Sequence, residues 1–547
     1  MSDDTANQGI PAPEGAADII ETDYEIGQDN IRTRIGPFGL DIHNPVFAIS
    51  GLTIIAFVAY AMVAPQQAGD FFGWLRPALT STFDWFFLMA ANVFVLFCLV
   101  LIVSPYGSVR LGGTEAVPDY SYAGWFAMLF AAGMGIGLMF FGVLEPVYHM
   151  AISEPLGVPS PIAEDGTLIE ANIEAARRMG LAATAFHWAL HPWAIYAVVA
   201  LALALFSYNK GLPLTIRSAF YPLLGERVWG WWGHIIDTMA VFATLFGLAT
   251  SLGFGAQQAN AGLEHIYGIP NTITVQVILI IAITGIALVS VLRGLDGGVK
   301  VLSEINMVIA LVLLLFVLFT AGAVGILTEF VSGLGAYLRE VVPLSNPFGR
   351  EDLGYMHGWT AFYWAWWISW SPFVGMFIAR VSRGRTVREF IICVLIIPSL
   401  VCVLWMATFG GAAINDVIAD PAGSAVKAQV IDSYNPPLSL FAMLESLPLS
   451  SITSTIGIVL VIVFFVTSSD SGSLVIDTIT AGGKVDAPVP QRVFWASFEG
   501  LVAIALLIGG GLGALQAMVI STGLPFAVIL LLMCVAIWKG LASERRG

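Results

Sequence analysis

Aromatic side chains crowd two apolar segments of the sequence, and their spacing suits the binding of a cation. Trp188, Trp193 and Tyr196 fall within about two helical turns, and Trp367 and Trp370 lie close together in a second segment. Ring faces attract cations through their quadrupole, by about 0.5–1 kcal/mol in water and about 2 kcal/mol in a dry site. Rings contributed by two helices could therefore hold a methylated ammonium head.

No acidic residue lies in the cores of the three apolar segments that form this site, 121–144, 181–207 and 358–379. A quaternary ammonium cannot donate hydrogen bonds, whereas a primary ammonium needs acceptors. The sequence therefore predicts a pocket in which rings alone hold an onium group, without a counter-charge.

Hydroxyl side chains follow one another at membrane depth in the segment 464–473. Polar groups at that depth are costly and favour a functional role. We expect the Thr467 and Ser468 hydroxyls to form an oxygen site for Na⁺ with carbonyls freed where the helix unwinds at Ala131 and Met134.

Asp470 follows these hydroxyls, and we expect it to brace the sodium site rather than contact the ion. The alternative is that the serines bond the helix backbone while Asp470 caps a helix or pairs locally.

A second hydroxyl pair, Thr250 and Ser251, has the same residue types as Thr467 and Ser468 and lies at the corresponding place in the other half of the chain. If the halves are inverted repeats, this second pair would form a second sodium site, with Thr244 and Phe373 as neighbours.

The composition predicts a membrane protein. Hydrophobic residues make up 57% of the 547 residues, charged residues only 11%, and the mean hydropathy is +0.83. A bilayer core needs about 20 apolar residues per helix. We assign twelve spans: 46–65, 84–104, 121–144, 181–207, 233–262, 272–292, 303–329, 358–379, 387–410, 452–478, 492–510 and 513–538.

The loop charges predict that both termini are cytoplasmic, because 17 of the 23 Lys and Arg residues then fall on the inner side. The acidic segment 1–45 is expected to be a disordered tail. The transporter domain would cover 46–540, and 541–547 would form a short cytoplasmic C-terminus.

Two spans carry helix-breaking residues at mid-bilayer and lie five spans apart. The third contains alternate glycines, Gly133, Gly135 and Gly137, each costing about 1 kcal/mol relative to Ala. The eighth contains Pro372. Paired interruptions of this kind indicate an inverted-repeat transporter with its site at the midplane. The repeats would cover 121–329 and 358–538, with the helices of 46–104 peripheral.

Other classes of function find little support in the sequence. No nucleophile and base are arranged for catalysis, so we expect no enzyme. His187 and His191 have helical metal-ligand spacing, but packing or capping is the preferred interpretation. A channel would need a continuous polar pore lining, and the charged spans are too few. Nucleic-acid binding is not expected.

The glycine run 133–137, the segment 366–375 (Trp-Trp-Ile-Ser-Trp-Ser-Pro-Phe-Val-Gly) and the pair Thr467-Ser468 closely resemble the betaine/carnitine/choline transporters over roughly residues 40–540. The resemblance implies an all-α membrane protein with twelve transmembrane helices in the leucine-transporter-like 5+5 inverted repeat, assembled as a trimer in the bacterial inner membrane.

The resemblance also assigns residues to roles. Trp188, Trp193, Tyr196 and Trp367 match the aromatic box, and Trp370 matches an inward substrate position. Substrate would also contact Gly133, Met134 and Gly135. One sodium site would consist of Ala131, Met134, Phe464, Thr467 and Ser468.

The expected function is import of a trimethylammonium or dimethylsulfonium osmolyte, glycine betaine or dimethylsulfoniopropionate, with Na⁺ by alternating access. Proton-coupled choline members carry an acid at the position of Gly137, so the glycine here favours a zwitterion and sodium. The alternative is a choline importer or a carnitine-type exchanger of the same family.

Overall fold

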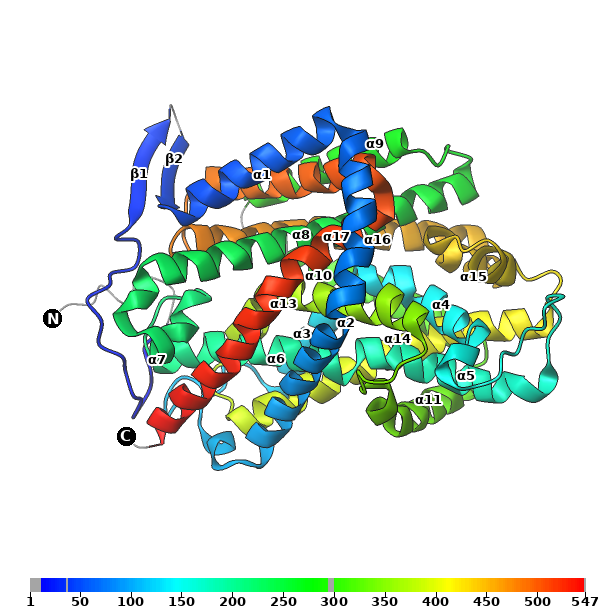
Figure 1. The fold of residues 1–547 in the computed structure, drawn as a ribbon, viewed down its shortest axis with the longest axis horizontal. Coiled ribbons are helices and arrows are strands. Elements are labelled where there is room, and N and C mark those ends of the chain that lie inside the picture. Colours follow the sequence, from blue (N-terminus) through cyan, green and yellow to red (C-terminus); the bar gives the residue numbers. More distant parts are fainter. Residues whose placement is uncertain (1–10, 36–37, 294–299, 546–547) are drawn as a thin grey trace.

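The computed structural model describes residues 11–35, 38–293 and 300–545. The polar backbone of a membrane-embedded chain must satisfy its hydrogen bonds internally, and helices do this within one segment. The described residues accordingly form a helical bundle with one small β-hairpin (Figure 1). Its first elements are β1 (Asn30–Ile35), β2 (Phe38–His43), α1 (Val46–Val63) and α2 (Pro65–Val103).

The helices that follow divide into two sets of five spans. The first set consists of α3 (Tyr122–Gly133) with α4 (Ile136–Ala151), α5 (Glu170–Trp188) with α6 (Leu190–Ala204), α8 (Trp231–Tyr267), α9 (Ile273–Arg293) and α10 (Lys300–Thr320). The second set consists of α13 (Ala361–Val381), α14 (Val387–Ala419), α16 (Ser450–Thr480) and the two halves of α17 (Val489–Glu544). The connecting helices are α11 (Ala323–Leu344) and the shorter α7 (Tyr221–Leu224), α12 (Leu353–Tyr355) and α15 (Ser439–Glu445).

The described helices account for twelve spans. Nine are long and apolar enough to cross a membrane, and the bent pair α3–α4 is a tenth. Non-helical torsions at Gly510 and Gly511 divide α17 into two, and α13 is the twelfth. The prediction of an all-α, multi-pass membrane protein is confirmed.

One predicted boundary is wrong. The seventh span was expected to cover 303–329, but α10 ends at Thr320 and α11 begins at Ala323. Gly322 has a φ of 96°, a left-handed conformation that ends the helix. The amphipathic helix α11 buries Ile326, Gly333 and Tyr337 against α5 and α14.

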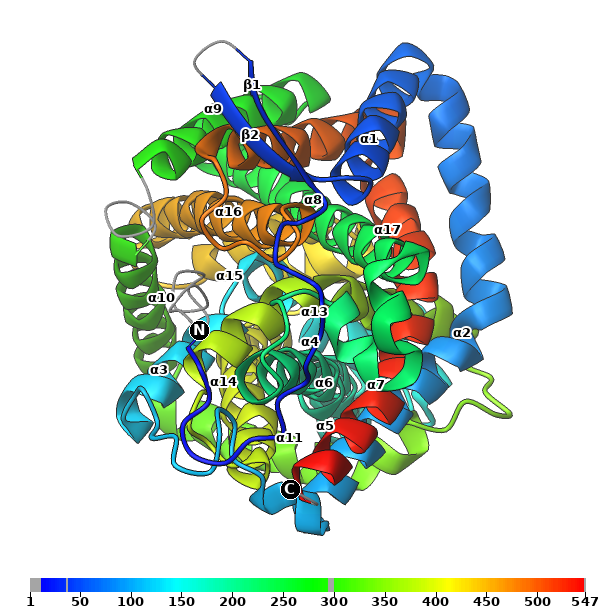
Figure 2. The ribbon, with the colours of Figure 1, turned by 90° about the vertical axis from the view of Figure 1, so that its left-hand side faces the viewer.

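The N-terminal segment 11–45 is not disordered where the structure describes it, contrary to the prediction; residues 1–10 lie outside the described range. Its acidic side chains bond basic groups at the end of the bundle that carries both termini (Figure 2). Glu14 pairs with Arg383, and Asp18 pairs with Lys210 at 2.7 Å. The Lys210 ammonium holds the pKa of the Asp18 carboxyl below its usual range.

Helix α13 packs closely against α8 and α17 because each of those helices presents a glycine to it. A Cβ on Gly247 of α8 would lie 2.8 Å from Trp370, and one on Gly523 of α17 would lie 2.8 Å from the Ala365 carbonyl. Small residues at such contacts are how membrane helices gain packing energy. The tryptophans of α13 are thereby held at fixed positions.

Candidate functional site

The third span is broken, as its glycines predict. Helix α3 ends at Gly133, α4 begins at Ile136, and the two bend by 66°. Met134 and Gly135 are extended, and the Met134 N–H donates to the Ala131 carbonyl at 3.2 Å. The break leaves backbone polar groups at the centre of the bundle.

The fourth span is also broken, which the sequence reasoning did not predict. Helix α5 ends at Trp188 and α6 begins at Leu190. Pro192 has no N–H to bond the Trp188 carbonyl four residues earlier, so the helix cannot continue regularly through this turn. The Leu190 N–H instead donates to the Tyr337 hydroxyl of α11 at 3.3 Å. The signal in the sequence was Pro192 itself.

The eighth span is not interrupted, so that prediction is wrong. Helix α13 runs without a break from Ala361 to Val381, through Pro372. The proline removes the N–H that would bond the Ile368 carbonyl, but the Ser371 hydroxyl donates to that carbonyl at 2.6 Å. A side-chain donor thus replaces the missing backbone donor and keeps the helix intact.

One cavity, here called the aromatic cavity, lies between α6, α13 and the break of α3–α4. Every residue predicted to bind substrate lines it. The lining consists of Ala132, Gly133, Met134, Gly135, Ile136, Gly137, Leu138, Trp188, Pro192, Trp193, Tyr196, Ser251, Trp366, Trp367, Trp370, Val374 and Cys402.

The rings of the aromatic cavity are buried except for the half-buried Trp370, and two pairs of them meet edge to face. The Trp188 and Trp367 centroids lie 4.9 Å apart at 72°, and those of Trp193 and Tyr196 lie 5.3 Å apart at 73°. Trp367 donates its indole N–H to the His187 carbonyl at 2.8 Å. Buried tryptophans of this kind are not the exposed rings of a headgroup belt, so a site in the protein interior explains them better.

A second cavity, here called the hydroxyl cavity, shares Ala132, Met134, Trp370 and Val374 with the first. Every residue predicted for the first sodium site lines it. The lining consists of Ala131, Ala132, Met134, Ser303, Asn306, Met307, Trp370, Phe373, Val374, Phe377, Phe464, Thr467, Ser468 and Ser471. The Thr467 hydroxyl donates to the Val463 carbonyl at 3.0 Å, which leaves its lone pairs free.

Helix α10 adds polar groups to the hydroxyl cavity that the sequence reasoning did not identify. Ser303 and Asn306 line it, and the Asn306 side-chain oxygen is buried without a hydrogen-bond partner among the described residues. The signal would have been an Asn in an otherwise apolar helix. A carbonyl oxygen of this kind is a suitable ligand for a hard cation.

Asp470 lies behind the hydroxyl cavity and does not line it. Its carboxylate forms an ion pair with Arg492 and accepts a hydrogen bond from Ser290 at 2.7 Å. Local pairing was the alternative interpretation of this residue, and the contacts also suit a brace for α16.

The residues of the second predicted sodium site are dispersed. Ser251 lines the aromatic cavity and Phe373 the hydroxyl cavity, whereas Thr244 and Thr250 line neither. The Thr250 hydroxyl lies 2.8 Å from the Phe246 carbonyl and 3.1 Å from the Leu515 carbonyl. A second sodium site remains a prediction.

An acidic residue stands behind the rings, outside the three predicted segments and outside the cavity lining, and the sequence reasoning did not identify it. Glu145 of α4, one residue beyond the predicted third span, is fully buried. Its Oε2 accepts hydrogen bonds from the Trp188 indole at 2.8 Å and the Tyr363 hydroxyl at 2.6 Å. The predicted span ended at 144, whereas α4 continues to Ala151 and so includes Glu145.

Glu145, His149 and His187 are the group of described residues whose donor atoms are close enough to suggest a metal site. The Glu145 Oε1 and His187 Nδ1 atoms are 2.5 Å apart, whereas two ligands of one tetrahedral Zn²⁺ lie about 3.3 Å apart. The Glu145–His187 contact is therefore a hydrogen bond, whereas His149 Nε2 lies 3.3 Å from the same oxygen. His191, four residues away, pairs instead with Asn92 at 3.1 Å.

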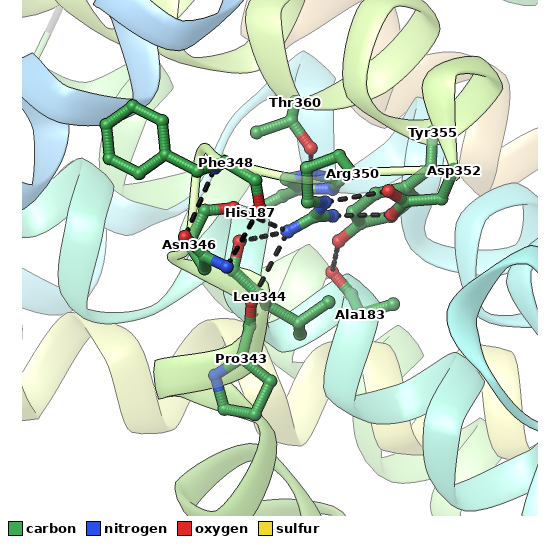
Figure 3. Close-up of polar contacts among 10 residues, drawn as sticks. All are labelled: Ala183, His187, Pro343, Leu344, Asn346, Phe348, Arg350, Asp352, Tyr355 and Thr360. Atoms are coloured by element: carbon green, nitrogen blue, oxygen red, sulfur yellow. Dashed lines mark hydrogen bonds and ion pairs between the residues drawn. The ribbon is translucent and has the colours of Figure 1, made fainter.

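His187 is held from the side away from the cavity. Figure 3 shows its ring beside Thr360, whose hydroxyl lies 3.0 Å from Nε2, and beside Tyr355, which donates to the Ala183 carbonyl. Next to Tyr355, Asp352 forms a salt bridge with Arg350. The Arg350 guanidinium also donates a hydrogen bond to the Leu344 carbonyl. This network fixes the loop that precedes α13.

The sequence was compared with known families and proteins. Residues 45–546 match the betaine/carnitine/choline family transporters. A glycine betaine/proline/choline transporter of Vibrio parahaemolyticus is 61% identical over 551 residues, which cover 100% of this chain and 98% of the relative.

Two further relatives extend this likeness. A glycine betaine/proline/choline/ectoine transporter of the same organism is 52% identical, over 96% of this chain and 91% of its own. The glycine betaine transporter OpuD of Bacillus subtilis is 42% identical, over 92% of this chain and 95% of its own.

Proposed function

This chain belongs to the betaine/carnitine/choline transporter family, and on that premise we propose that it imports glycine betaine or dimethylsulfoniopropionate together with Na⁺. It is a transporter with twelve transmembrane helices in the leucine-transporter-like 5+5 inverted repeat, not an enzyme. The observation that carries the proposal is the aromatic cavity, in which Trp188, Trp193, Tyr196 and Trp367 surround one space.

Ring faces are suited to the methylated head of such a substrate. The head has no N–H to satisfy, is cheap to desolvate, and gains up to about 2 kcal/mol from each ring in a dry site. Three or four rings therefore supply enough affinity for micromolar to millimolar binding. The names of the relatives add choline and proline to the substrates worth testing.

Gly137 supports a zwitterion over the proton-coupled choline alternative. A Cβ there would lie 2.8 Å from the Trp188 ring and 3.1 Å from the Trp366 ring, so the packed rings leave no room for an acidic side chain. A carnitine-type exchanger or choline importer remains the alternative that substrate competition must test.

The hydroxyl cavity supports sodium coupling. Thr467, Ser468 and backbone near Ala131 and Met134 offer hard oxygen ligands beside the aromatic cavity, with Asn306 as an added ligand. One charge moved through 100 mV releases about 2.3 kcal/mol, which supports roughly 40-fold accumulation.

Alternating access would use the two broken spans. The breaks at Met134–Gly135 and Ala189 both adjoin the aromatic cavity, and the half-helices on either side of the 66° bend between α3 and α4 are the ones free to tilt. Both termini lie at one end of the molecule (Figure 1), which we place in the cytoplasm of a bacterium, with the chain in the inner membrane as a lipid-embedded homotrimer.

Uptake into proteoliposomes tests the proposal. Labelled glycine betaine should accumulate when an inward Na⁺ gradient is imposed and not with a K⁺ gradient of equal size. Excess dimethylsulfoniopropionate should compete strongly, and choline, carnitine and proline more weakly. Uptake that is indifferent to Na⁺ refutes sodium coupling, and stronger competition by choline or carnitine favours the alternative.

Ring variants test the cavity itself. Trp193→Leu and Trp367→Leu should each weaken glycine betaine binding by at least about tenfold, because each removes a ring face from a desolvated cation. Trp231→Leu is the control, since Trp231 is 67% exposed and does not line the cavity. Unchanged affinity in both cavity variants would contradict the assignment.

A further inference from the structure

A fully buried carboxylate lies directly behind the aromatic cavity, although it does not line it. Glu145 has no exposed surface, and its Oε2 contacts the indole N–H of Trp188 and the hydroxyl of Tyr363. Trp188 therefore has its ring in the aromatic cavity and its polar edge on a carboxylate. The transport proposal alone gives Glu145 no role.

The hydrogen-bonding inventory indicates how this carboxylate is held. An indole N–H can only donate, and the Tyr363 hydroxyl donates as well, so Oε2 accepts two bonds. The other oxygen, Oε1, lies 2.5 Å from His187 Nδ1. Because Thr360 can donate its hydroxyl to His187 Nε2, the histidine tautomer that donates to Glu145 is also satisfied. Three donors thus surround an ionised carboxylate, and a second buried histidine, His149, has its Nε2 3.3 Å from the same Oε1.

The same pair of residues positions a second ring of the aromatic cavity. The His187 carbonyl accepts the Trp367 indole N–H at 2.8 Å, and the Trp188 and Trp367 centroids are 4.9 Å apart. His187 is itself held by Tyr355, whose ring stacks on it at 5.0 Å (Figure 3). Glu145 therefore holds one ring directly and another through His187.

A carboxylate that accepts the indole N–H should strengthen the attraction of that ring for a cation. The ring face is negative because of its quadrupole, and an anion at the N–H edge adds electron density and a negative potential in a medium of low dielectric constant. The carboxylate does not contact the substrate. Its charge acts on the substrate through the Trp188 ring, which lines the cavity.

We propose that Glu145 is a positioning residue that serves as an indirect counter-charge for the onium head, acting through the Trp188 ring. The proposal rests on the proposed function, since it presumes an onium ligand in the aromatic cavity. It explains how a cavity without a lining carboxylate can still prefer a positive head. It also predicts that charge, rather than shape, is what Glu145 contributes.

A pair of ligands of equal shape separates charge from shape. Glycine betaine carries a trimethylammonium head, and 3,3-dimethylbutanoate has the same outline with a neutral carbon in place of nitrogen. The dissociation constants of both are measured by tryptophan fluorescence on purified Glu145→Gln, Glu329→Gln and wild-type protein. Glu329 is a suitable control because it is buried, pairs with Arg177 and lies on α11 away from the rings.

We expect Glu145→Gln to raise the dissociation constant of glycine betaine about fivefold to tenfold and that of 3,3-dimethylbutanoate less than twofold. Glu329→Gln should change neither by as much as twofold. Equal weakening of both ligands in Glu145→Gln would mean a structural role and overturn the proposal. Unchanged binding of glycine betaine would overturn it as well.

A double variant keeps the test decisive where the neutral ligand binds too weakly to titrate. Trp188→Phe retains a ring but removes the N–H that contacts Glu145. In that background Glu145→Gln should weaken glycine betaine binding less than twofold, because its route to the substrate is gone. A full additive loss overturns the inference. If wild-type protein binds no onium ligand, the proposed function fails together with it.

Discussion

The third and eighth spans both carry helix-breaking residues, yet only one of them breaks. Helices α3 and α4 meet at a 66° bend, whereas α13 continues through Pro372. At the bend, Gly135 adopts a φ of −175° and Met134 leaves the helical region, and the Gly133 carbonyl accepts only a long contact of 4.0 Å from the Cys402 thiol among the described side chains. In α13, the Ser371 hydroxyl bonds the carbonyl that Pro372 leaves free.

The difference shows that a glycine or proline need not interrupt a helix when a neighbouring side chain replaces the lost backbone hydrogen bond. The broken span provides space and backbone oxygens, and the straight span provides rings at fixed positions. A binding site made of both can offer a soft aromatic surface to the onium head and hard oxygens to a small cation. Three substitutions test this division of roles, in order of decreasing expected effect.

The largest effect is expected at the glycine where the two spans approach. Gly137→Ala would place a Cβ 2.8 Å from the Trp188 ring and 3.1 Å from that of Trp366. Overpacking of this kind costs about 1–3 kcal/mol, so the glycine betaine dissociation constant should rise about tenfold or more. Fluorescence titration measures it. Gly285→Ala is the control, because a Cβ there meets nothing within 4 Å, and an equal effect of both would undermine the packing argument.

A smaller effect is expected where the broken span faces the hydroxyls of α16. Thr467→Ala removes an oxygen from the hydroxyl cavity, and the Na⁺ concentration for half-maximal uptake should rise about fivefold, as expected for the loss of one ordinary hydrogen-bond equivalent of about 1 kcal/mol. The maximal rate at saturating Na⁺ should change less.

Thr478→Ala is the matched control for this substitution. Thr478 is on the same helix and its hydroxyl donates only to the Leu474 carbonyl. A sodium dependence that shifts equally in both variants would place the ion elsewhere.

The smallest effect is expected in the straight span. Ser371→Ala leaves the Ile368 carbonyl without a donor, and the protein should lose about 1 kcal/mol of stability, seen as a lower melting temperature in detergent. Pro372→Ala restores a backbone N–H at that position. The Ser371→Ala change should therefore cost little in the Pro372→Ala background, and an undiminished cost would show that the hydroxyl does not replace the backbone bond.

Local sequence determined much of this molecule. Hydropathy located the spans because each must be apolar over its own length, and the glycines located the break in α3–α4 because a low helix propensity is a property of the residues themselves. The residue types of the aromatic and hydroxyl cavities could be named for the same reason: rings and hydroxyls at membrane depth are rare enough to indicate their use.

Tertiary structure alone decided which of these residues meet. Glu145 lies 43 positions before Trp188 in the chain, and its contact with that ring follows from how α4 packs on α5. The continuity of α13 depends on which rotamer Ser371 adopts, and the ordered course of residues 11–35 depends on basic groups such as Lys210 and Arg383 from distant segments. Hydrogen bonds and ion pairs between helices are set by packing, and packing is not a local property of the sequence.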